Sequence, residues 1–211
     1  MKRWLAILAA LLCVGCASAA SEGGGIDDDF GGGSPQWEIT SGALTFNEGV
    51  ARTDSPVFRM VSADRSYNDV IVTVTLAVDA LHGGPDWSGA HIWVRYQSEY
   101  ELYAVSVDRE DGAMIIKKKC AGGPDPSNGG TYYNLTDYQN AGPIPYGHWQ
   151  NVVVAVYDLP NGDVEIMANR DGHGLTAVDN GLGCRPLHNG GVGVRSDNAV
   201  LRIDRFVAQR S

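Results

Sequence analysis

Short runs of alternating apolar and polar residues recur along this sequence and limit the folds that it can adopt. In the run from Val70 to Val78, every second residue is Val or Leu, and Thr73 and Thr75 lie between them. A period of two, built from β-branched residues, predicts a strand that buries one face. Similar runs occur at residues 91–96, 102–107, 114–118, 152–157, 164–168, 191–194 and 201–207.

Turn-forming dipeptides separate these runs, and no part of the sequence has a sustained helical period with capping residues. Many short strands with such punctuation predict an all-β sandwich or barrel. Residues 50–61 are expected to form two short strands broken at Ser55-Pro56. Residues 121–146 lack periodicity and predict a long loop, a kind of segment that often carries function. The clearest turn signals are Asp111-Gly112, Asn161-Gly162 and Asp171-Gly172.

The N-terminus predicts an export signal. Basic residues at positions 2 and 3 precede an apolar run over residues 4–14, which is shorter than the roughly 20 residues of a membrane span. Two cleavage sites compete: Ala17-Ser18-Ala19 suits ordinary signal peptidase, whereas residues 12–16 resemble a bacterial lipobox. The second alternative, which we favour, would place a lipid on Cys16, although Cys13 stands where a leucine is usual.

From this N-terminus we expect a chain of three parts. Residues 1–19 would be the signal peptide, residues 20–25 a flexible Gly-rich tether, and residues 26–211 one folded domain. The protein would then be secreted, periplasmic or on the outer cell envelope. It would contact a membrane only through a lipid on Cys16.

Two cysteines remain for the folded domain, Cys120 and Cys184. In an oxidising compartment such a pair predicts a disulfide, which would close a long loop and stabilise the fold by about 4 kcal/mol. A metal site is the alternative. It is disfavoured because neither cysteine has a second cysteine or a histidine at zinc-finger spacing.

The charge of the chain argues against nucleic acid as a partner. The formal net charge is −9, and removal of a leader that carries Lys2 and Arg3 would make the remaining chain still more acidic. Apart from residues 117–119, all of which are lysine, no basic stripe is present. Nucleic-acid binding requires a concentrated cationic face, so we expect none.

A series of short motifs, in order along the chain, resembles concanavalin A-like lectin/glucanase domains of the laminin-G-like type over residues 26–209. The resemblance implies two stacked antiparallel sheets in a jelly-roll sandwich, with one sheet bent to form a concave face. It implies glycan binding or glycan cleavage without choosing between them. The motifs are Asp28-Asp29-Phe30, Trp37, Ser41-Gly42, residues 88–97, Tyr100, Tyr103, residues 147–149, residues 169–172, residues 191–194 and residues 203–206.

The run at residues 91–96 supplies the leading candidates for glycan contact. If its even-numbered residues face the core, His91, Trp93 and Arg95 point outward along one line. In the family's arrangement that outward face would be the concave one. Trp93 would offer a flat plate to a sugar ring, Arg95 a forked donor, and His91 a proton carrier. The alternative is that Trp93 packs under a loop, Arg95 pairs with an acid and His91 is merely solvated.

Two lysines extend this candidate face. Lys117 and Lys119 fall on one side of their strand and Lys118 on the other. Beside Arg95 they would form a cationic groove suited to an acidic polysaccharide, although a run of charges is also typical of an ordinary solvated surface. Gln97, directly after the run at residues 91–96, is a further candidate for ligand contact.

Enzymatic activity is less well supported than binding. Retaining glucanases of the resembled family carry Glu-x-Asp-x-x-Glu on one strand, and this sequence has no such run. A polysaccharide lyase would use Arg, Gln or Asn against a uronate carboxylate and His or Tyr as the base. His91, Arg95 and Gln97 supply these residue types, but the Tyr-Phe-Lys-Ala-Gly signature of alginate lyases is missing. No nucleophile elbow is present.

No cofactor is required by this interpretation, but jelly rolls of the resembled type often hold a structural calcium ion. Asp28 near the start and Asp204 near the end are candidate ligands, with Asp27 and Asp29 beside the first, because hard oxygen ligands suit Ca²⁺. The alternative is an acidic, solvated N-terminus.

Three functions remain open at this point. The favoured one is extracytoplasmic polysaccharide binding at a concave sheet face. The second is a polysaccharide lyase of the same fold, with His91 and Arg95 as catalytic candidates. The third is an adhesion or scaffold module of the cell envelope without glycan chemistry.

Overall fold

The computed structural model describes residues 24–32, 35–126 and 129–211. The predicted signal peptide, most of the tether and Cys16 therefore lie outside the described residues. All sixteen regular elements in the described part are strands. No helix there is long and apolar enough to cross a membrane.

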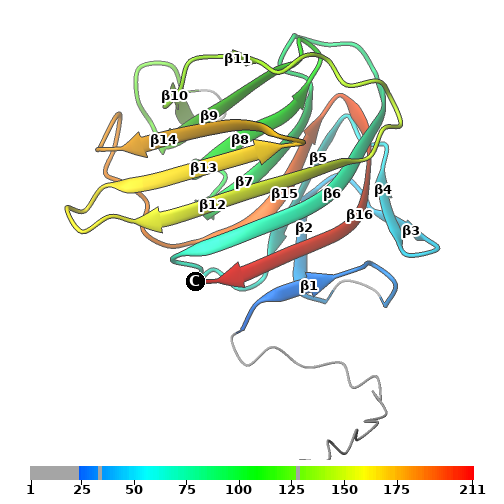
Figure 1. Ribbon diagram of the computed structural model, residues 1–211, viewed down its shortest axis with the longest axis horizontal. Helices are drawn as coiled ribbons and strands as arrows, with labels where there is room; N and C mark the ends of the chain where they lie inside the picture. The colour runs from blue at the N-terminus through cyan, green and yellow to red at the C-terminus, as the bar shows by residue number, and fades with distance from the viewer. Residues whose placement is uncertain (1–23, 33–34, 127–128) are drawn as a thin grey trace, which may run out of the picture.

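The strands form two antiparallel sheets that stack face to face (Figure 1). We call them the first and the second sheet. The first sheet contains, in spatial order, β14 (His173–Asp179), β13 (Val164–Arg170), β12 (Gln150–Asp158), β6 (Val70–Leu81), β16 (Ala199–Arg210), β4 (Val50–Thr53) and β3 (Thr45–Asn47), and β1 (Ile26–Asp28) pairs with β16.

The second sheet lies behind the first in the same view. It carries the candidate residues of the sequence analysis. It contains, in spatial order, β10 (Gly130–Asn134), β9 (Ala113–Ala121), β8 (Glu101–Arg109), β7 (Gly89–Ser98), β15 (Gly191–Asp197), β5 (Val57–Ser62) and β2 (Trp37–Ser41), and β11 (Gln139–Asn140) pairs with β9.

The core fills the space between the sheets and follows the alternation of the sequence. In β6, Val72, Val74 and Leu76 are fully buried, while the residues between them face away from the second sheet. Trp37 packs edge-to-face on Phe206, with ring centroids 4.7 Å apart. The predicted all-β, two-sheet antiparallel jelly-roll sandwich is thus confirmed, and the barrel alternative is excluded.

Two further predictions about elements can be compared with the structure. The break at Ser55-Pro56 is confirmed, because β4 ends at Thr53 and β5 begins at Val57. The long loop over 121–146 is partly wrong, since β10 and β11 both lie within it and pair with β9. Strand β14 was not predicted.

The predicted disulfide between Cys120 and Cys184 is present, with a Cα–Cα distance of 5.9 Å. It joins the end of β9 to the connection between β14 and β15. Beside it, the fully buried ammonium of Lys118 pairs with the fully buried carboxylate of Asp179 at 2.7 Å. The disulfide and this ion pair hold the second sheet to the first at this end of the sandwich.

Candidate functional site

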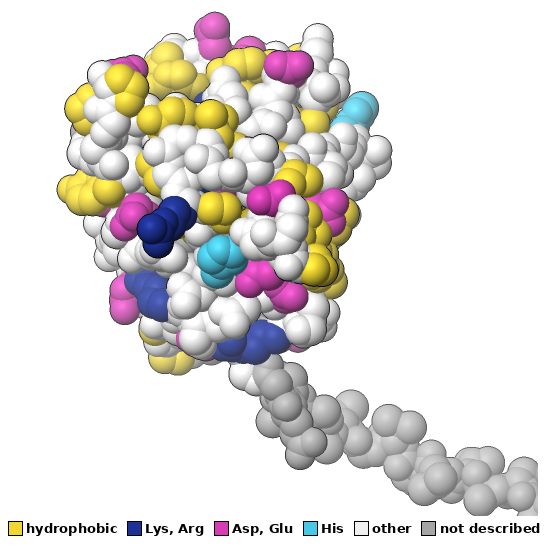
Figure 2. Space-filling view, turned by 90° about the vertical axis from the view of Figure 1, so that its left-hand side faces the viewer, with side chains coloured by type: hydrophobic (Ala, Val, Ile, Leu, Met, Phe, Trp, Pro, Cys, Tyr) yellow, Lys and Arg dark blue, Asp and Glu magenta, His cyan; other side chains and the backbone are white. Residues whose placement is uncertain are grey.

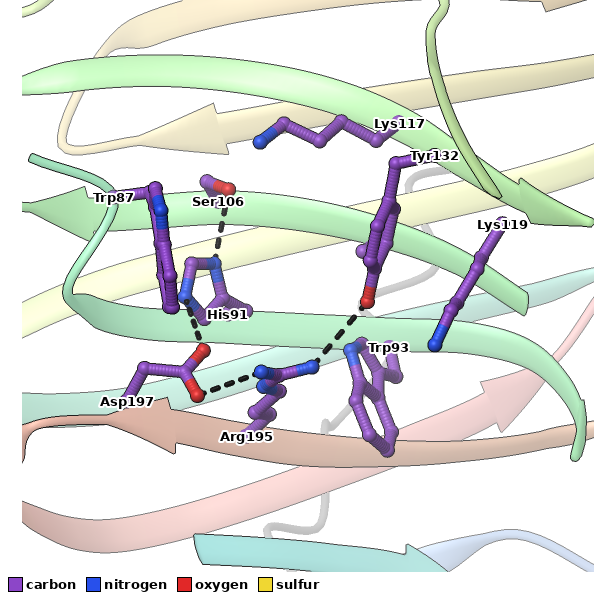
Figure 3. Close-up of a pocket in the computed structure, with 10 residues that line it drawn as sticks. Trp87, His91, Trp93, Ser106, Lys117, Lys119, Tyr132, Arg195 and Asp197 are labelled. Atoms are coloured by element: carbon purple, nitrogen blue, oxygen red, sulfur yellow. Dashed lines mark hydrogen bonds and ion pairs between the residues drawn. The ribbon is translucent and has the colours of Figure 1, made fainter. Parts of the chain in front are cut away.

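A pocket of about 210 Å³ lies on the outer face of the second sheet (Figure 3). In β7 and β8, Ile92, Val94 and Val105 point into the core. Because side chains alternate along a strand, the residues between them point outward and form the floor of the pocket. The lining consists of Trp87, His91, Trp93, Ala104, Ser106, Lys117, Lys119, Tyr132, Arg195 and Asp197.

Five of these residues form a chain of polar contacts across four strands, drawn as dashed lines in Figure 3. Ser106 Oγ lies 2.9 Å from His91 Nδ1, and His91 Nε2 lies 3.3 Å from Asp197 Oδ2. Arg195 donates to Asp197 at 2.7 Å and to the hydroxyl of Tyr132 at 3.3 Å. This chain holds the Arg195 guanidinium in place at the centre of the pocket.

The protonation states in the chain follow from burial and charge. Burial lowers the pKa of His91, against the influence of Asp197, so the imidazole is neutral at neutral pH. Burial raises the pKa of Asp197, but contact with His91 and the Arg195 guanidinium outweighs this and holds that pKa at about 2. Asp197 is therefore ionised and serves as the counter-ion of Arg195.

Two ammonium groups extend from β9 into the same pocket. Neither Lys117 nor Lys119 has a carboxylate within 4.0 Å among the described residues, and both lie near aromatic rings instead. Burial lowers the pKa of Lys117 to about 8, with the nearby Arg109 guanidinium adding to the effect. The pKa of Lys119 is lowered for the same main reason.

The aromatic residues of the pocket differ in what they present. Trp93 is only 1% exposed and stacks on Tyr96, with ring centroids 5.3 Å apart. The expectation that Trp93 offers a flat plate is therefore wrong, because its faces are covered. Trp93 forms part of the floor of the pocket instead, and its buried indole Nε1 has no hydrogen-bond partner within the described protein. The accessible rings are those of Trp87, which is 42% exposed, and Tyr132.

Arg95 was predicted to share this face, and the structure contradicts that position. Its side chain is fully buried and bonds Asp158 at 2.9 Å, Asp69 at 3.3 Å and the backbone oxygen of Leu187 at 3.1 Å. Its backbone is left-handed, with φ of 51°, at a bulge where β7 loses register with both of its neighbours. The bulge reverses the alternation, so Arg95 ties the second sheet to the first.

Gln97 follows the same bulge and does not line the pocket either. Its side-chain amide donates to the backbone oxygen of Asn189 at 3.1 Å, and the residue is exposed. Of the residues predicted for ligand contact, the structure therefore brings His91, Trp93 and Lys117 together and places Arg95 and Gln97 elsewhere.

Sequence analysis missed Arg195 and Asp197, which complete the pocket. The predicted strand ended at residue 194, whereas β15 continues to Asp197. The alternation of Gly193, Arg195 and Asp197 was the available signal. It was hidden because polar residues at the end of an apolar run resemble a turn.

The calcium candidates do not form a site in the described part of the chain. Asp28 is buried, and its two oxygens accept hydrogen bonds from the backbone N–H of Phe30 at 2.7 Å and from Trp37 Nε1 at 2.6 Å. Asp204 lies on the exposed side of β16. Among the described residues, no group of three or more His, Cys, Asp or Glu side chains gathers that could hold a metal ion.

Comparisons with known proteins identify the fold. No protein-family model matches the sequence, and no curated protein matches it. Solved structures do match. Carbohydrate-binding module CBM66 from Bacillus subtilis aligns with a TM-score of 0.59 at 13% identity, over 80% of this chain and 92% of that one.

Two further structures extend the likeness. The exoplasmic/lumenal domain of VIP36 in a Ca²⁺- and mannose-bound form aligns with a TM-score of 0.61 at 11% identity, over 89% of both chains. Crh5 transglycosylase in complex with NAG aligns with a TM-score of 0.57 at 11% identity, over 89% of this chain and 84% of that one.

The chain has the concanavalin A-like lectin/glucanase jelly-roll fold. The resemblance found in the sequence is thus confirmed at the level of architecture. At identities this low, the shared concanavalin A-like fold leaves ligand and activity to be argued from the pocket itself.

Proposed function

We propose that this protein is an extracytoplasmic glycan-binding protein whose ligand lies in the pocket on the outer face of the second sheet. The observation that carries the proposal is the lining of that pocket. Accessible aromatic rings and several hydrogen-bond donors converge on one hollow, which is the usual composition of a small-molecule site.

Each kind of lining residue has a role in this proposal. Trp87 exposes ring surface on which the apolar face of a sugar ring can pack, and the half-buried ring of Tyr132 borders the same pocket. Arg195 would donate to the ring oxygens and hydroxyls. Because the chain of contacts through Asp197 already orients Arg195, little side-chain entropy is lost when the ligand binds.

The cellular location is part of the same proposal. The basic, apolar and small-residue segments of residues 1–19 support export, and a disulfide between Cys120 and Cys184 suits an oxidising compartment. Attachment through a lipid on Cys16 would place the domain at the cell envelope, on the Gly-rich tether of residues 20–25.

Retention by polysaccharides tests the proposal. The purified protein would migrate through native gels that contain a panel of neutral and acidic polysaccharides, alongside Trp87→Ala and Trp149→Ala. Trp149 is a matched control, because it is 41% exposed and lies outside the pocket lining. We expect retardation by at least one polysaccharide, weakened about tenfold or more by Trp87→Ala and unchanged by Trp149→Ala.

A second candidate is a polysaccharide lyase, favoured by the presence of His91, Tyr132 and Arg195 in one pocket. A lyase would release products with ultraviolet-absorbing unsaturated ends, so the same panel is assayed for absorbance. Retardation without product supports binding, and product formation supports the lyase. If no polysaccharide retards the protein and none is cleaved, glycan binding is wrong and an envelope adhesion or scaffold role replaces it.

A further inference from the structure

We infer that the glycan held in this pocket is acidic, and that Lys117 and Lys119 bind its carboxylate or sulfate groups. The inference rests on the proposed function and names the chemical class of the ligand.

Both lysines lack a counter-ion in the part of the chain that the structure describes. Within the described residues, Lys119 is buried and Lys117 half-buried, and neither forms an ion pair. Figure 3 shows the Lys117 side chain extending over Ser106 and that of Lys119 reaching toward Trp93. A charge removed from water without a partner costs free energy, which an anionic ligand would recover.

Most other basic side chains among the described residues have a carboxylate partner. Lys118, between the two lysines, is paired with Asp179, and seven arginines outside the pocket are paired with carboxylates as well. Figure 2 shows one side of the surface, on which acidic and basic side chains are interspersed rather than gathered into a basic face. Three described arginines outside the pocket, Arg52, Arg170 and Arg185, also have no carboxylate within 4.0 Å. Arg52 and Arg185 are exposed to water, and the buried Arg170 donates to the backbone oxygens of Val107, Ala141 and Gly142. Within the described residues, Lys117 and Lys119 differ from them in being withdrawn from water with neither a carboxylate nor a backbone oxygen as a recorded partner.

Asp197 does not neutralise the two lysines. It is the one carboxylate in the described lining of the pocket. One oxygen accepts from Arg195 at 2.7 Å, and the other lies 3.3 Å from His91 Nε2. Counting Lys117, Lys119 and Arg195 against Asp197, the lining carries an excess of two positive charges, on a chain whose formal charge is −9.

Donors outnumber free acceptors in the described lining. The two ammonium groups can only donate, and no acceptor among the described residues satisfies the buried Trp93 Nε1 and Arg195 Nε beside them. The hydroxyl of Tyr132 already accepts from Arg195. A neutral sugar hydroxyl brings a donor with every acceptor, whereas carboxylate and sulfate oxygens only accept. A site built this way selects an anion.

Polymers that differ only in charge test the inference. Polygalacturonate is compared with its fully methyl-esterified form, and dextran sulfate with dextran, as ligands in affinity gels at physiological salt. The variants are Lys117→Gln and Lys119→Gln, with Arg205→Gln as a control. Arg205 has the same charge, is exposed on β16 and pairs with Asp27 far from the pocket lining.

We expect retardation by at least one acidic polymer and not by its uncharged counterpart. Each lysine variant should weaken the retardation about tenfold or more, as for other hydrogen bonds to charged groups, and Arg205→Gln should not. Retention by polygalacturonate alone assigns a carboxylate, and retention by dextran sulfate alone a sulfate. Circular dichroism confirms that each variant is folded.

The experiment distinguishes failure of the acidic-ligand inference from failure of glycan binding itself. Equal retardation by a charged polymer and its uncharged counterpart, lost in Trp87→Ala, overturns the acidic ligand and leaves glycan binding in place. An equal loss in Arg205→Gln and the lysine variants overturns the assigned site, because the attraction is then a general effect of charge. Absence of retardation by every polymer of this set and of the wider panel overturns both proposals.

Discussion

Lys117 is the residue whose titration would make ligand binding in the pocket depend on pH. Its pKa is lowered to about 8, chiefly by burial, and an anionic ligand favours its protonated form. Affinity for an acidic glycan should therefore be constant below pH 7 and fall as pH rises through about 8. The charged groups that act on Lys117 are Arg109, Asp111, Arg195 and Asp197.

The measurement is an isothermal titration with an acidic oligosaccharide between pH 6 and pH 10. Lys117→Arg is the control, because a guanidinium stays charged throughout this range. As pH rises through about 8, this variant should lose less affinity than the unmodified protein, which loses up to about tenfold per pH unit. A decline that remains in the variant at higher pH is expected from Lys119, whose pKa is also lowered. A parallel decline in both proteins would show that another group governs the effect.

Asp197 should make the stability of the protein depend on pH in the acidic range. Its folded pKa of about 2 lies below the ordinary aspartate value of 3.8. A depressed carboxyl pKa contributes stability above the unfolded pKa, and this contribution is lost as pH falls through the folded pKa. Asp197→Asn should therefore lower the free energy of unfolding by about 2 kcal/mol at pH 7, with the difference disappearing between about pH 4 and pH 2.

Urea unfolding at several pH values measures this difference. Asp204→Asn serves as the control, because Asp204 is exposed on β16 and has no partner in the described ion pairs. Its stability should follow that of the unmodified protein at every pH. A pH-independent loss in Asp197→Asn would mean that the carboxylate acts through packing and not through its charge.

At the scale of elements, a buried ion pair connects β9 of the second sheet with β14 of the first. Lys118 and Asp179 are both fully buried, and Asp179 also accepts a hydrogen bond from Tyr103 at 2.6 Å. Removal of one partner leaves an uncompensated charge in the core, so Lys118→Met should cost about 3–5 kcal/mol. The neutral pair Lys118→Met/Asp179→Asn should recover part of this loss.

Chemical denaturation of the single and double variants yields the coupling free energy between the two residues. Lys117→Met, one position earlier on β9, is the control, because its ammonium faces the pocket and has no ion pair in the described structure. It should change stability little. Additive losses in the Lys118 and Asp179 variants would mean that the two charges do not stabilise each other.

Strand alternation explains how much of this site could be predicted from sequence. A period of two was enough to place His91 and Trp93 on one face and to separate Lys117 from Lys118. It failed at Arg95, where the bulge depends on a distant residue. At Gly190 of the connection before β15, a Cβ atom would lie 2.4 Å from the backbone carbon of Arg95, so only glycine permits this approach. A contact between segments far apart in sequence leaves no local pattern.

Weak local signals account for the other misses. Strand β14 alternates Leu175, Ala177 and Asp179 toward the core, but it begins with His173 and Gly174, and glycine is a poor strand former. Strand β10 is hidden in a segment rich in glycine and tyrosine. Both strands lie at the edges of their sheets, where pairing with one neighbour decides the conformation.

At the scale of the whole molecule, the charge of the protein and that of the pocket have opposite signs. A chain with a formal charge of −9 repels an acidic polymer at long range. At physiological salt this repulsion is screened beyond about 8 Å, whereas the contacts of Lys117, Lys119 and Arg195 act at shorter distances. The net charge of the protein therefore does not prevent an acidic polymer from binding in the pocket.

The pocket's chemistry also predicts binding without turnover. Glycoside hydrolysis needs two carboxyl groups, roughly 5–10 Å apart, one of them protonated. The described lining offers Asp197 alone, ionised with a pKa of about 2. A lyase needs a free base, but both ring nitrogens of His91 already face Ser106 and Asp197. Burial raises the pKa of Tyr132, which keeps its hydroxyl protonated.

We therefore expect that prolonged incubation with a polysaccharide that is retained yields neither new reducing ends nor unsaturated ends. Mass spectrometry of the recovered polymer and ultraviolet absorbance measure the two. If unsaturated ends do appear and Tyr132→Phe abolishes them, the hydroxyl acts on the substrate and the pocket is a lyase site. In that case Arg195, which donates to both Asp197 and Tyr132, would be the group that lowers the barrier to deprotonating the tyrosine.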